Sequence, residues 1–287
     1  MKKFEIPGSV SFNEGKGGLT KIDIRTRWSA AEIYLHGAQI TGFQKTGEPP
    51  LLFMSRLSQF ASGKAIRGGV PICFPWFGPR DGDVAHGFAR VTEWEVISTA
   101  MEPSGAVTVR LRLPETPAKA KWPTFATEFV VTIAETLTME LVTTNRSNHE
   151  LIFEDCLHTY FAVGEITKVS VSGLKSAWYL DKADGGRRKQ ETAEAIVISQ
   201  ETNRTYLNTA GAVEIHDAAF NRIIRIGKSG SNSTVVWNPW TTQLMSDFAV
   251  EEHAKMVCVE SGNVGENKIV LNPGATVVLK VVLSSRN

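Results

Sequence analysis

Cysteine is scarce in this chain of 287 residues. Only Cys73, Cys156 and Cys258 occur, and no two of them form a CxxC pair. An odd and widely spaced set supports neither a disulfide framework nor a sequence-local zinc site. We therefore interpret the three cysteines as free thiols in a reducing compartment.

Long hydrophobic runs are also absent. The N-terminal segment MKKFEIPGSV has two lysines but lacks the apolar stretch that a secretory signal needs behind them. Dense apolar stretches such as 277–283 contain a lysine and are far shorter than a membrane span. The sequence thus predicts a cytoplasmic protein with no membrane partner.

Net charge is close to zero, because 31 basic residues offset 30 acidic ones. This balance argues against a surface that binds nucleic acid or anionic lipid as a whole. It leaves room for a local cluster of arginines that binds one small anion.

Helical periodicity is weak, and only residues 247–254 have a pattern suited to two helical turns. Period-two alternation dominates instead, with about 15 candidate strands separated by Gly, Pro and Asn turns. The short junction at 134–135 predicts a hairpin. We predict one all-β domain over residues 1–287, a large antiparallel sandwich with few short helices. The clearest strand patterns are 106–113, 128–133, 136–143, 222–226, 234–237, 256–260 and 275–283.

The most unusual segment is 64–90, KAIRGGVPICFPWFGPRDGDVAHGFAR. Alternation fails here, and the prolines and glycines indicate a rigid, shaped loop. Its aromatic and polar side chains are typical of a small-molecule pocket, and aromatic rings also suit the apolar faces of sugars. A packed structural loop at one end of a sandwich is the alternative. The segment contains Arg67, Arg80, Asp81, Asp83, His86 and Arg90, of which Arg80, Asp81 and Asp83 are assigned no role.

Arg67 and Arg90 are candidate anion ligands. Arg67 precedes Gly68 and Gly69, whose bare backbone N–H groups would add donors beside its guanidinium. Taken singly, each arginine is more often a surface charge. The most polar stretch, 183–190, is better explained as a solvated turn than as a phosphate loop, because it lacks a strand–loop–helix context.

Glu260 ends the alternating run KMVCVE and shares a face with Met256 and Cys258. A carboxyl on an apolar face has a raised pKa unless it is paired, which suits a general acid or base. Residues 261–263 are predicted to turn. A salt bridge, or a strand-end glutamate facing solvent, is the alternative.

His158 follows a run in which alternation puts Ile152, Glu154 and Cys156 on its face. A lone histidine at a strand end is usually structural, and catalysis is the alternative. Trp240, in the corner Asn238-Pro239-Trp240, belongs either to the core or to the platform of a sugar site.

Six blocks follow one another along the chain, AIRGGVP (65–71), FPWFG (74–78), HGFAR (86–90), LHTYF (157–161), VWNPW (236–240) and VCVE (257–260). Together they make the chain resemble the glucose-6-phosphate 1-epimerases, the hexose-6-phosphate mutarotases of the aldose 1-epimerase superfamily. The resemblance runs from about residue 10 to the C-terminus.

The resemblance implies a galactose mutarotase-like β-supersandwich that interconverts the α and β anomers of a hexose 6-phosphate, expected to be glucose 6-phosphate. By matching motifs, His158 would be the general acid and Glu260 the general base. Arg67 and Arg90 would contact the ligand, including its phosphate, and His86 would line the sugar pocket.

Asn203 and Trp240 complete the substrate contacts that we predict. At the position of Asn203 the family often carries aspartate. Asparagine can still bind a sugar hydroxyl, but it has no charge with which to support a histidinium.

The chemistry that this resemblance implies needs neither a cofactor nor a metal. A base removes the proton of the C1 hydroxyl, an acid protonates the ring oxygen, and the C1–O5 bond breaks. The aldehyde then rotates and closes to the other anomer. Histidine suits the acid, because its ordinary pKa of about 6.5 lies near working pH.

Three other functions compete with this interpretation. They are an aldose 1-epimerase for unphosphorylated sugar, a carbohydrate-binding sandwich without catalysis, and an extracellular lectin or polysaccharide lyase. The last is disfavoured by the missing signal segment. The only partner we expect is a small sugar phosphate, and we favour a monomer.

Overall fold

The computed structural model describes residues 1–243 and 245–287. Its strands form four antiparallel sheets joined by turns and short 3₁₀ helices, which confirms the predicted all-β class. The 3₁₀ helices are η1 (Lys2–Phe4), η2 (Lys16–Gly18), η3 (Ala89–Val91), η4 (Lys119–Lys121), η5 (Ile166–Lys168), η6 (Lys182–Asp184), η7 (Val250–Lys255) and η8 (Gly265–Asn267).

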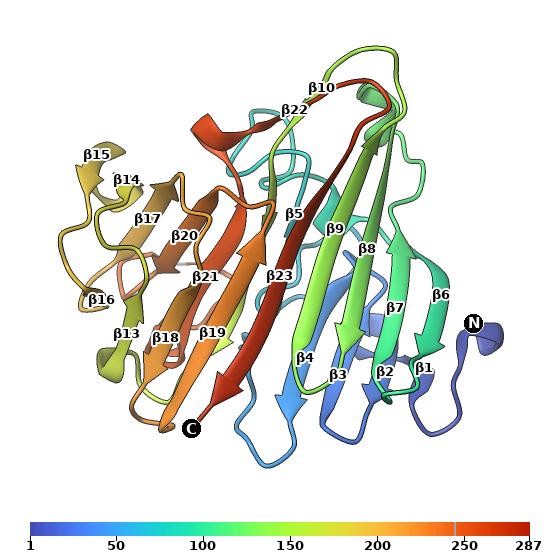
Figure 1. The fold of residues 1–287 in the computed structure, drawn as a ribbon, viewed down its shortest axis with the longest axis horizontal. Coiled ribbons are helices and arrows are strands. Elements are labelled where there is room, and N and C mark those ends of the chain that lie inside the picture. Colours follow the sequence, from blue (N-terminus) through green and yellow to red (C-terminus); the bar gives the residue numbers. More distant parts are fainter. Residues whose placement is uncertain (244) are drawn as a thin grey trace.

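The largest sheet has nine strands in the order β16-β13-β18-β19-β23-β9-β8-β7-β6 and runs in Figure 1 from β16 on the left to β6 on the right. The predicted hairpin at 134–135 is present, since Ile133 of β8 faces Leu137 of β9. The strands are β6 (Glu95–Met101), β7 (Val107–Arg112), β8 (Phe125–Ile133), β9 (Leu137–Asn145), β13 (Val169–Ser172), β16 (Ala195–Val197), β18 (Val213–Asp217), β19 (Arg222–Ser229) and β23 (Thr276–Arg286).

A second sheet of eight strands runs in the order β15-β14-β17-β20-β21-β11-β5, with β12 also paired to β21. Its strands are β5 (Ile72–Cys73), β11 (Asp155–Leu157), β12 (Tyr160–Ala162), β14 (Trp178–Asp181), β15 (Arg187–Gln190), β17 (Thr202–Leu207), β20 (Ser233–Asn238) and β21 (Met256–Asn263). The smaller sheets are β1 (Val10–Glu14), β2 (Thr20–Arg25), β3 (Ser29–Tyr34) and β4 (Gln39–Lys45), and the pair β10 (Leu151–Phe153) and β22 (Ile269–Leu271).

The eight-stranded sheet is buried on both faces around β20 and β21. Val236 and Val259 point into the main core, which is shared with the other sheets. Their neighbours Val235 and Cys258 point the other way, into a smaller apolar cluster. Because β21 is covered on both sides, all of its eight residues are buried. The smaller cluster therefore provides an apolar floor on the second face of this sheet.

Two expectations from the sequence are wrong at this sheet. Residues 261–263 do not turn, because Ser261 pairs with Leu157 on one side of β21 and with Thr234 on the other. The run 151–158 is not one strand, because it breaks at Glu154 and changes sheet. Ile152 is therefore exposed and does not share the buried face of Cys156.

The expected two helical turns at 247–254 also need correction. The structure has a 3₁₀ helix over residues 250–255 in their place.

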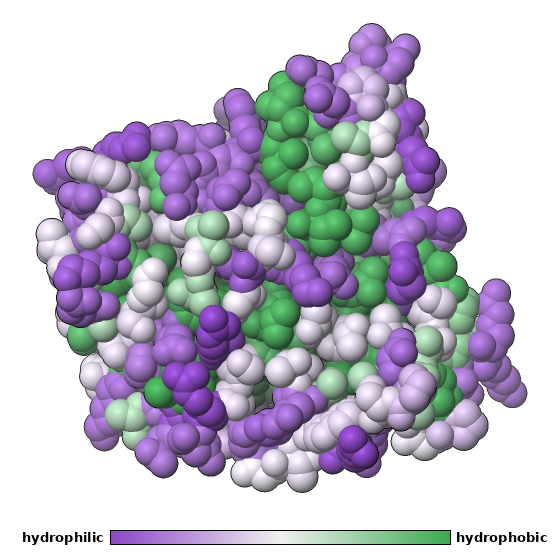
Figure 2. Space-filling view, viewed as in Figure 1, coloured by the Kyte–Doolittle hydropathy of each residue, from purple (hydrophilic) through white to green (hydrophobic). Residues whose placement is uncertain are grey.

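Ile152 and Val270 face each other in the β10–β22 pair and are both about half exposed. The β10–β22 pair lies near the top of Figure 1, and Figure 2 shows an apolar area near the top of the same view. In the described residues, no helix is both long and apolar enough to cross a membrane.

Gly262 lies where β21 passes closest to β11. A Cβ atom there would lie 2.2 Å from the carbonyl oxygen of Asp155 and 2.7 Å from the Cα of Cys156, both backbone atoms that cannot rotate away. Gly262→Ala is expected to lower the free energy of unfolding by roughly 3 kcal/mol, as overpacking does. Urea unfolding measures this loss. Gly42→Ala in β4 is the control, since its nearest neighbour would be 3.6 Å away, and equal losses in both variants would contradict the prediction.

Candidate active site

A cavity of about 260 Å³ opens on the second face of the eight-stranded sheet. It collects side chains from the 64–90 loop, from the β11–β12 connection, from β17, β20 and β21, and from η6. The predicted pocket wall is therefore supported by geometry. The lining residues are Arg67, Phe77, Gly78, Pro79, His86, His158, Lys182, Asn203, Val235, Trp237, Gln243, Met245 and Glu260.

Glu260 lies at the floor of this cavity and is 1% exposed. The parity of β21 puts it on the same face as Cys258, as predicted. The Cys156 thiol donates a hydrogen bond of 3.6 Å to its Oε2. Burial raises the pKa of Glu260 to about 8, against the smaller opposing effects of Lys182, the Cys156 hydrogen bond and Arg90.

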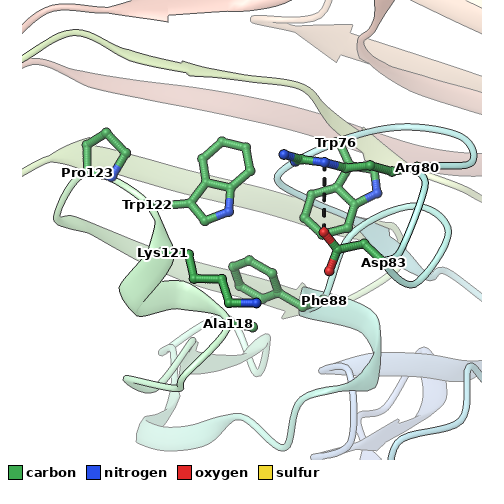
Figure 3. Close-up of a pocket in the computed structure, with 8 residues that line it drawn as sticks. All are labelled: Trp76, Arg80, Asp83, Phe88, Ala118, Lys121, Trp122 and Pro123. Atoms are coloured by element: carbon green, nitrogen blue, oxygen red, sulfur yellow. Dashed lines mark ion pairs between the residues drawn. The ribbon is translucent and has the colours of Figure 1, made fainter.

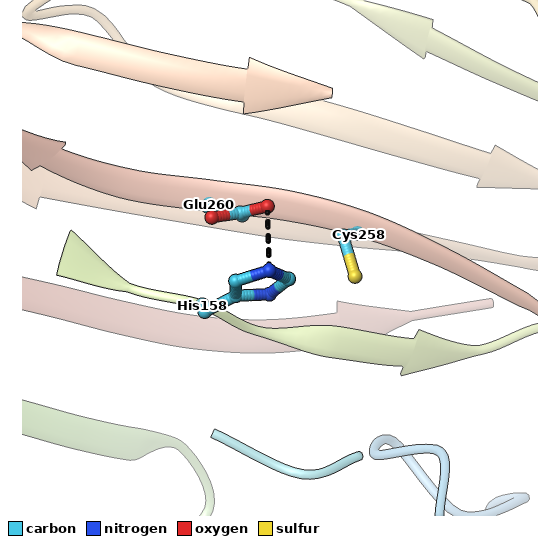
Figure 4. Close-up of side chains that lie close together, drawn as sticks. All are labelled: His158, Cys258 and Glu260. Atoms are coloured by element: carbon cyan, nitrogen blue, oxygen red, sulfur yellow. Dashed lines mark ion pairs between the residues drawn. The ribbon is translucent and has the colours of Figure 1, made fainter. Parts of the chain in front are cut away.

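His158 approaches Glu260 from the connection between β11 and β12. Its Nε2 lies 3.3 Å from Oε1 of Glu260 (Figure 4). The ring stacks on Tyr160 with centroids 4.9 Å apart. Burial lowers the pKa of His158 well below its ordinary value, and the neighbouring side chains His86, Arg90 and Arg67 lower it further. Within the described residues, its buried Nδ1 has no hydrogen-bond partner.

The opposite shifts of Glu260 and His158 mean that the pair holds one proton around neutral pH. That proton either stays on the carboxyl or passes along the 3.3 Å contact to give carboxylate and imidazolium. Groups this close titrate as a unit, so the proton belongs to the pair. Such a pair can give one proton and take another without changing its own total.

The stability of the protein is expected to fall as pH rises from about 6.5 to about 8. In the middle of this window the unfolded chain has lost most of the protons of both groups, whereas the folded pair still holds most of one proton. Folding takes up about half a proton at either end of the window and more in its middle, so about 1.4 kcal/mol per proton and pH unit amounts to roughly 1 kcal/mol over the window. Urea unfolding at both pH values measures this loss.

Glu260→Gln provides the comparison, because an amide cannot hold the proton. Burial also raises the pKa of Asp155, to about 7. This makes the free energy of unfolding fall with rising pH in both proteins alike. The difference between the two proteins therefore isolates the Glu260–His158 pair. Identical pH profiles for wild type and variant would count against a shared proton.

His86 closes the cavity from the 64–90 loop. Its Nδ1 accepts a hydrogen bond of 3.3 Å from the Gly78 N–H and lies 3.4 Å from the Cys73 sulfur. Burial, together with the charges of Arg90 and Lys182, lowers the pKa of His86 to about 3. The ring is therefore neutral with its proton on Nε2, which makes it a hydrogen-bond donor for a ligand.

Two cationic side chains line the cavity. Arg67 is held by Tyr160, whose hydroxyl accepts from Nη1 at 3.0 Å, and by Asp247, whose carboxylate lies 3.1 Å from Nη2. Lys182 begins η6, and its Nζ lies 5.0 Å from the centroid of Phe77. The sequence reasoning missed Lys182, which directly precedes the stretch interpreted as a solvated turn.

Of the other predicted substrate contacts, Asn203 lines the cavity, whereas Arg90 and Trp240 do not. Asn203 lines the cavity from β17, so its amide can reach a ligand. Arg90 is not among the lining residues, and its Nη2 donates instead to the Ala85 carbonyl at 2.6 Å. Trp240 also lies outside the lining, where it packs on the core and contacts the His253 ring at 5.1 Å.

Arg80 and Asp83 lie on the other side of the same loop, in a separate pocket shown in Figure 3. The Arg80 guanidinium lies over the rings of Trp76 and Trp122, at 4.8 and 5.5 Å from their centroids. Its Nε is 3.8 Å from Asp83. These contacts join the 74–90 loop to the segment around Trp122. Arg80 therefore has a packing role and does not line the cavity.

Comparison with known proteins shows the family of the chain. The family model for aldose 1-epimerase matches residues 21–284. Several curated relatives bear the name "Putative glucose-6-phosphate 1-epimerase". The one from Cenchrus ciliaris is 34% identical over 93% of this chain and 85% of its own length. The one from Escherichia coli strain K12 is 36% identical over 84% of this chain and 82% of its own length.

Solved structures place the fold in the same group. A crystal structure from Salmonella typhimurium described as "a putative mutarotase" has a TM-score of 0.91 and 28% identity, covering 99% of this chain and 95% of that one. A galactose mutarotase-like protein from Clostridium acetobutylicum has a TM-score of 0.76 at 15% identity, covering 97% and 98%. This second match concerns the fold alone and agrees with the predicted mutarotase-like sandwich. The chain belongs to the aldose 1-epimerase family.

Proposed function

We propose that this protein is a glucose-6-phosphate 1-epimerase, which interconverts the α and β anomers of a hexose 6-phosphate. The observation that carries the proposal is the buried Glu260–His158 pair at 3.3 Å, placed at the floor of a cavity with two cations in its wall. The names of the relatives support the phosphorylated substrate. We also propose a cytoplasmic location, which fits three buried free thiols.

Ring opening needs one proton removed and one supplied. Glu260, as carboxylate, takes the proton of the C1 hydroxyl, while His158, as imidazolium, gives its proton to the ring oxygen. The C1–O5 bond breaks, and closure on the other face of the aldehyde reverses both transfers. The pair ends with the single proton with which it began, so no cofactor or metal is needed to restore it.

The phosphate would lie near Arg67 and Lys182. Arg67 presents a planar guanidinium already oriented by Tyr160 and Asp247, and Lys182 adds a second charge. Arg67 is also one of the groups that lower the pKa of His158. A bound dianion would offset that charge and make the imidazolium easier to form, so phosphate binding would favour the acid that the reaction needs.

Two-dimensional exchange NMR with the purified protein tests the proposal. Cross-peaks between the anomers of glucose 6-phosphate should grow in proportion to protein concentration, and those of glucose should grow far less. Equal rates for both sugars would favour the aldose 1-epimerase for free sugar. Binding of glucose 6-phosphate without any increase in exchange would favour a non-catalytic carbohydrate-binding sandwich.

A further inference from the structure

Three side chains of types that can bind a metal ion lie close together beside the cavity, and two of them, His158 and Glu260, line it. Ligand atoms of His158, Cys258 and Glu260 all lie within 4.8 Å of one another, and all three residues are buried (Figure 4). Cys258 and Glu260 are two residues apart on β21, so both side chains leave the same face of the sheet. The catalytic proposal uses His158 and Glu260 but assigns nothing to the thiol.

We propose that His158, Cys258 and Glu260 form a tridentate site for Zn²⁺, and that the bound ion inhibits the enzyme. Binding follows from the ligand geometry alone, whereas inhibition rests on the proposed function. The ion is an inhibitor here and takes no part in turnover.

The spacing of the ligand atoms suits zinc after small movements. Zn–N and Zn–S bonds of about 2.0 and 2.3 Å put the ligand atoms of a tetrahedral site roughly 3.3–3.5 Å apart. The contact between His158 and Glu260, at 3.3 Å, already has that length. The remaining separations, up to 4.8 Å, need only small side-chain rotations of Cys258 and Glu260.

The chemistry of the three groups favours zinc over harder cations. Thiolate and imidazole are ligands that zinc prefers, and a carboxylate is a common third ligand. Nδ1 of His158 has no partner within the described residues, so no other side-chain hydrogen bond fixes the ring. Three protein ligands leave a fourth position for water or a sugar hydroxyl on the cavity side.

Charge and protons also balance. The Cys258 thiol and the Glu260–His158 pair release one proton each to solvent when the ion binds. Thiolate and carboxylate then offset the charge of the ion, so Arg67 and Lys182 in the cavity wall face a neutral complex. Once ligated, Glu260 cannot accept the C1 hydroxyl proton and His158 cannot protonate the ring oxygen. The bound ion should therefore inhibit the exchange of anomers.

Zinc titration of the anomer exchange tests inhibition. Chelator-treated wild type should be inhibited by Zn²⁺, and excess EDTA should restore its rate. Cys258→Ala should keep the basal exchange rate and raise the half-inhibiting zinc concentration about tenfold or more, because it lacks the thiolate. Cys73→Ala, which removes a buried thiol outside the triad, should keep the zinc sensitivity of wild type. Wild-type sensitivity in Cys258→Ala would overturn the proposal.

Cobalt(II) absorption tests binding without any activity. The wild-type protein titrated with Co²⁺ should develop a thiolate-to-cobalt charge-transfer band and the intense visible bands of a tetrahedral site. Both should be lost in Cys258→Ala and kept in Cys73→Ala. Absence of these bands in wild type would overturn the metal site. If the bands appear but the protein does not exchange anomers, the site stands and the proposed function fails.

Discussion

Glu260→Gln is expected to slow the protein-dependent exchange between the anomers of glucose 6-phosphate by about 10²–10⁴-fold, the usual contribution of one general base. The amide keeps the shape of the side chain and can still hydrogen-bond His158, 3.3 Å away in the wild type. It cannot take the C1 hydroxyl proton at any working pH. Since the reaction also proceeds unaided, the quantity to measure is the slope of exchange rate against protein concentration.

The control for this variant is Glu191→Gln. Glu191 is also a buried carboxylate, but it binds Arg204 and Tyr206 and does not line the cavity. Glu191→Gln should lower the free energy of unfolding and leave the exchange rate close to that of the wild type. A Glu260→Gln protein that unfolds cooperatively and retains near wild-type exchange would remove Glu260 from the mechanism.

The two catalytic groups should also be non-additive. Neither group accelerates the reaction without the other, because a proton must be removed from the C1 hydroxyl and another given to the ring oxygen. We expect the double variant Glu260→Gln with His158→Gln to be about as slow as the slower single variant. Losses that multiply would mean that the two residues act independently.

The position of Glu260 could be predicted because it depends on local geometry. Strand alternation at β21 alone puts Glu260 and Cys258 on one face, and the structure buries both there. The continuation of β21 through Asn263 could not be predicted in this way. It depends on pairing with β11, more than a hundred residues earlier in the chain, and on the hydrogen bond from Asn263 to Asp155.

Long-range pairing also explains which contacts the sequence missed or misplaced. Lys182 and Asn203 reach the cavity because β14 pairs with β17 and β17 with β20, a register that local pattern does not contain. The motif favours Arg90 as a ligand contact, and in the structure its guanidinium donates a hydrogen bond to the Ala85 carbonyl in its own loop. The residue types in a motif indicate chemistry, whereas sheet order decides which of them meet.

Lys182→Met is expected to lower kcat/KM for glucose 6-phosphate about 10–100-fold, since a hydrogen bond to a charged group contributes about 1.5–3 kcal/mol. Methionine keeps an unbranched side chain that can still cover the Phe77 ring. Arg67 is less suitable for this test, because it also donates a hydrogen bond to Tyr160, on which the His158 ring stacks. For glucose, which has no phosphate, the change should stay within about threefold.

Lys189→Met is the matched control, because Lys189 pairs with Asp181 and Asp184 at 2.8 and 2.6 Å and does not line the cavity. It removes the same charge from the same basic stretch of the chain, so it measures any effect of long-range attraction on the substrate. That effect should disappear at high salt, whereas a direct contact of Lys182 with phosphate should persist. If both variants lose activity equally, or if Lys182→Met slows glucose as much as glucose 6-phosphate, Lys182 does not bind the phosphate.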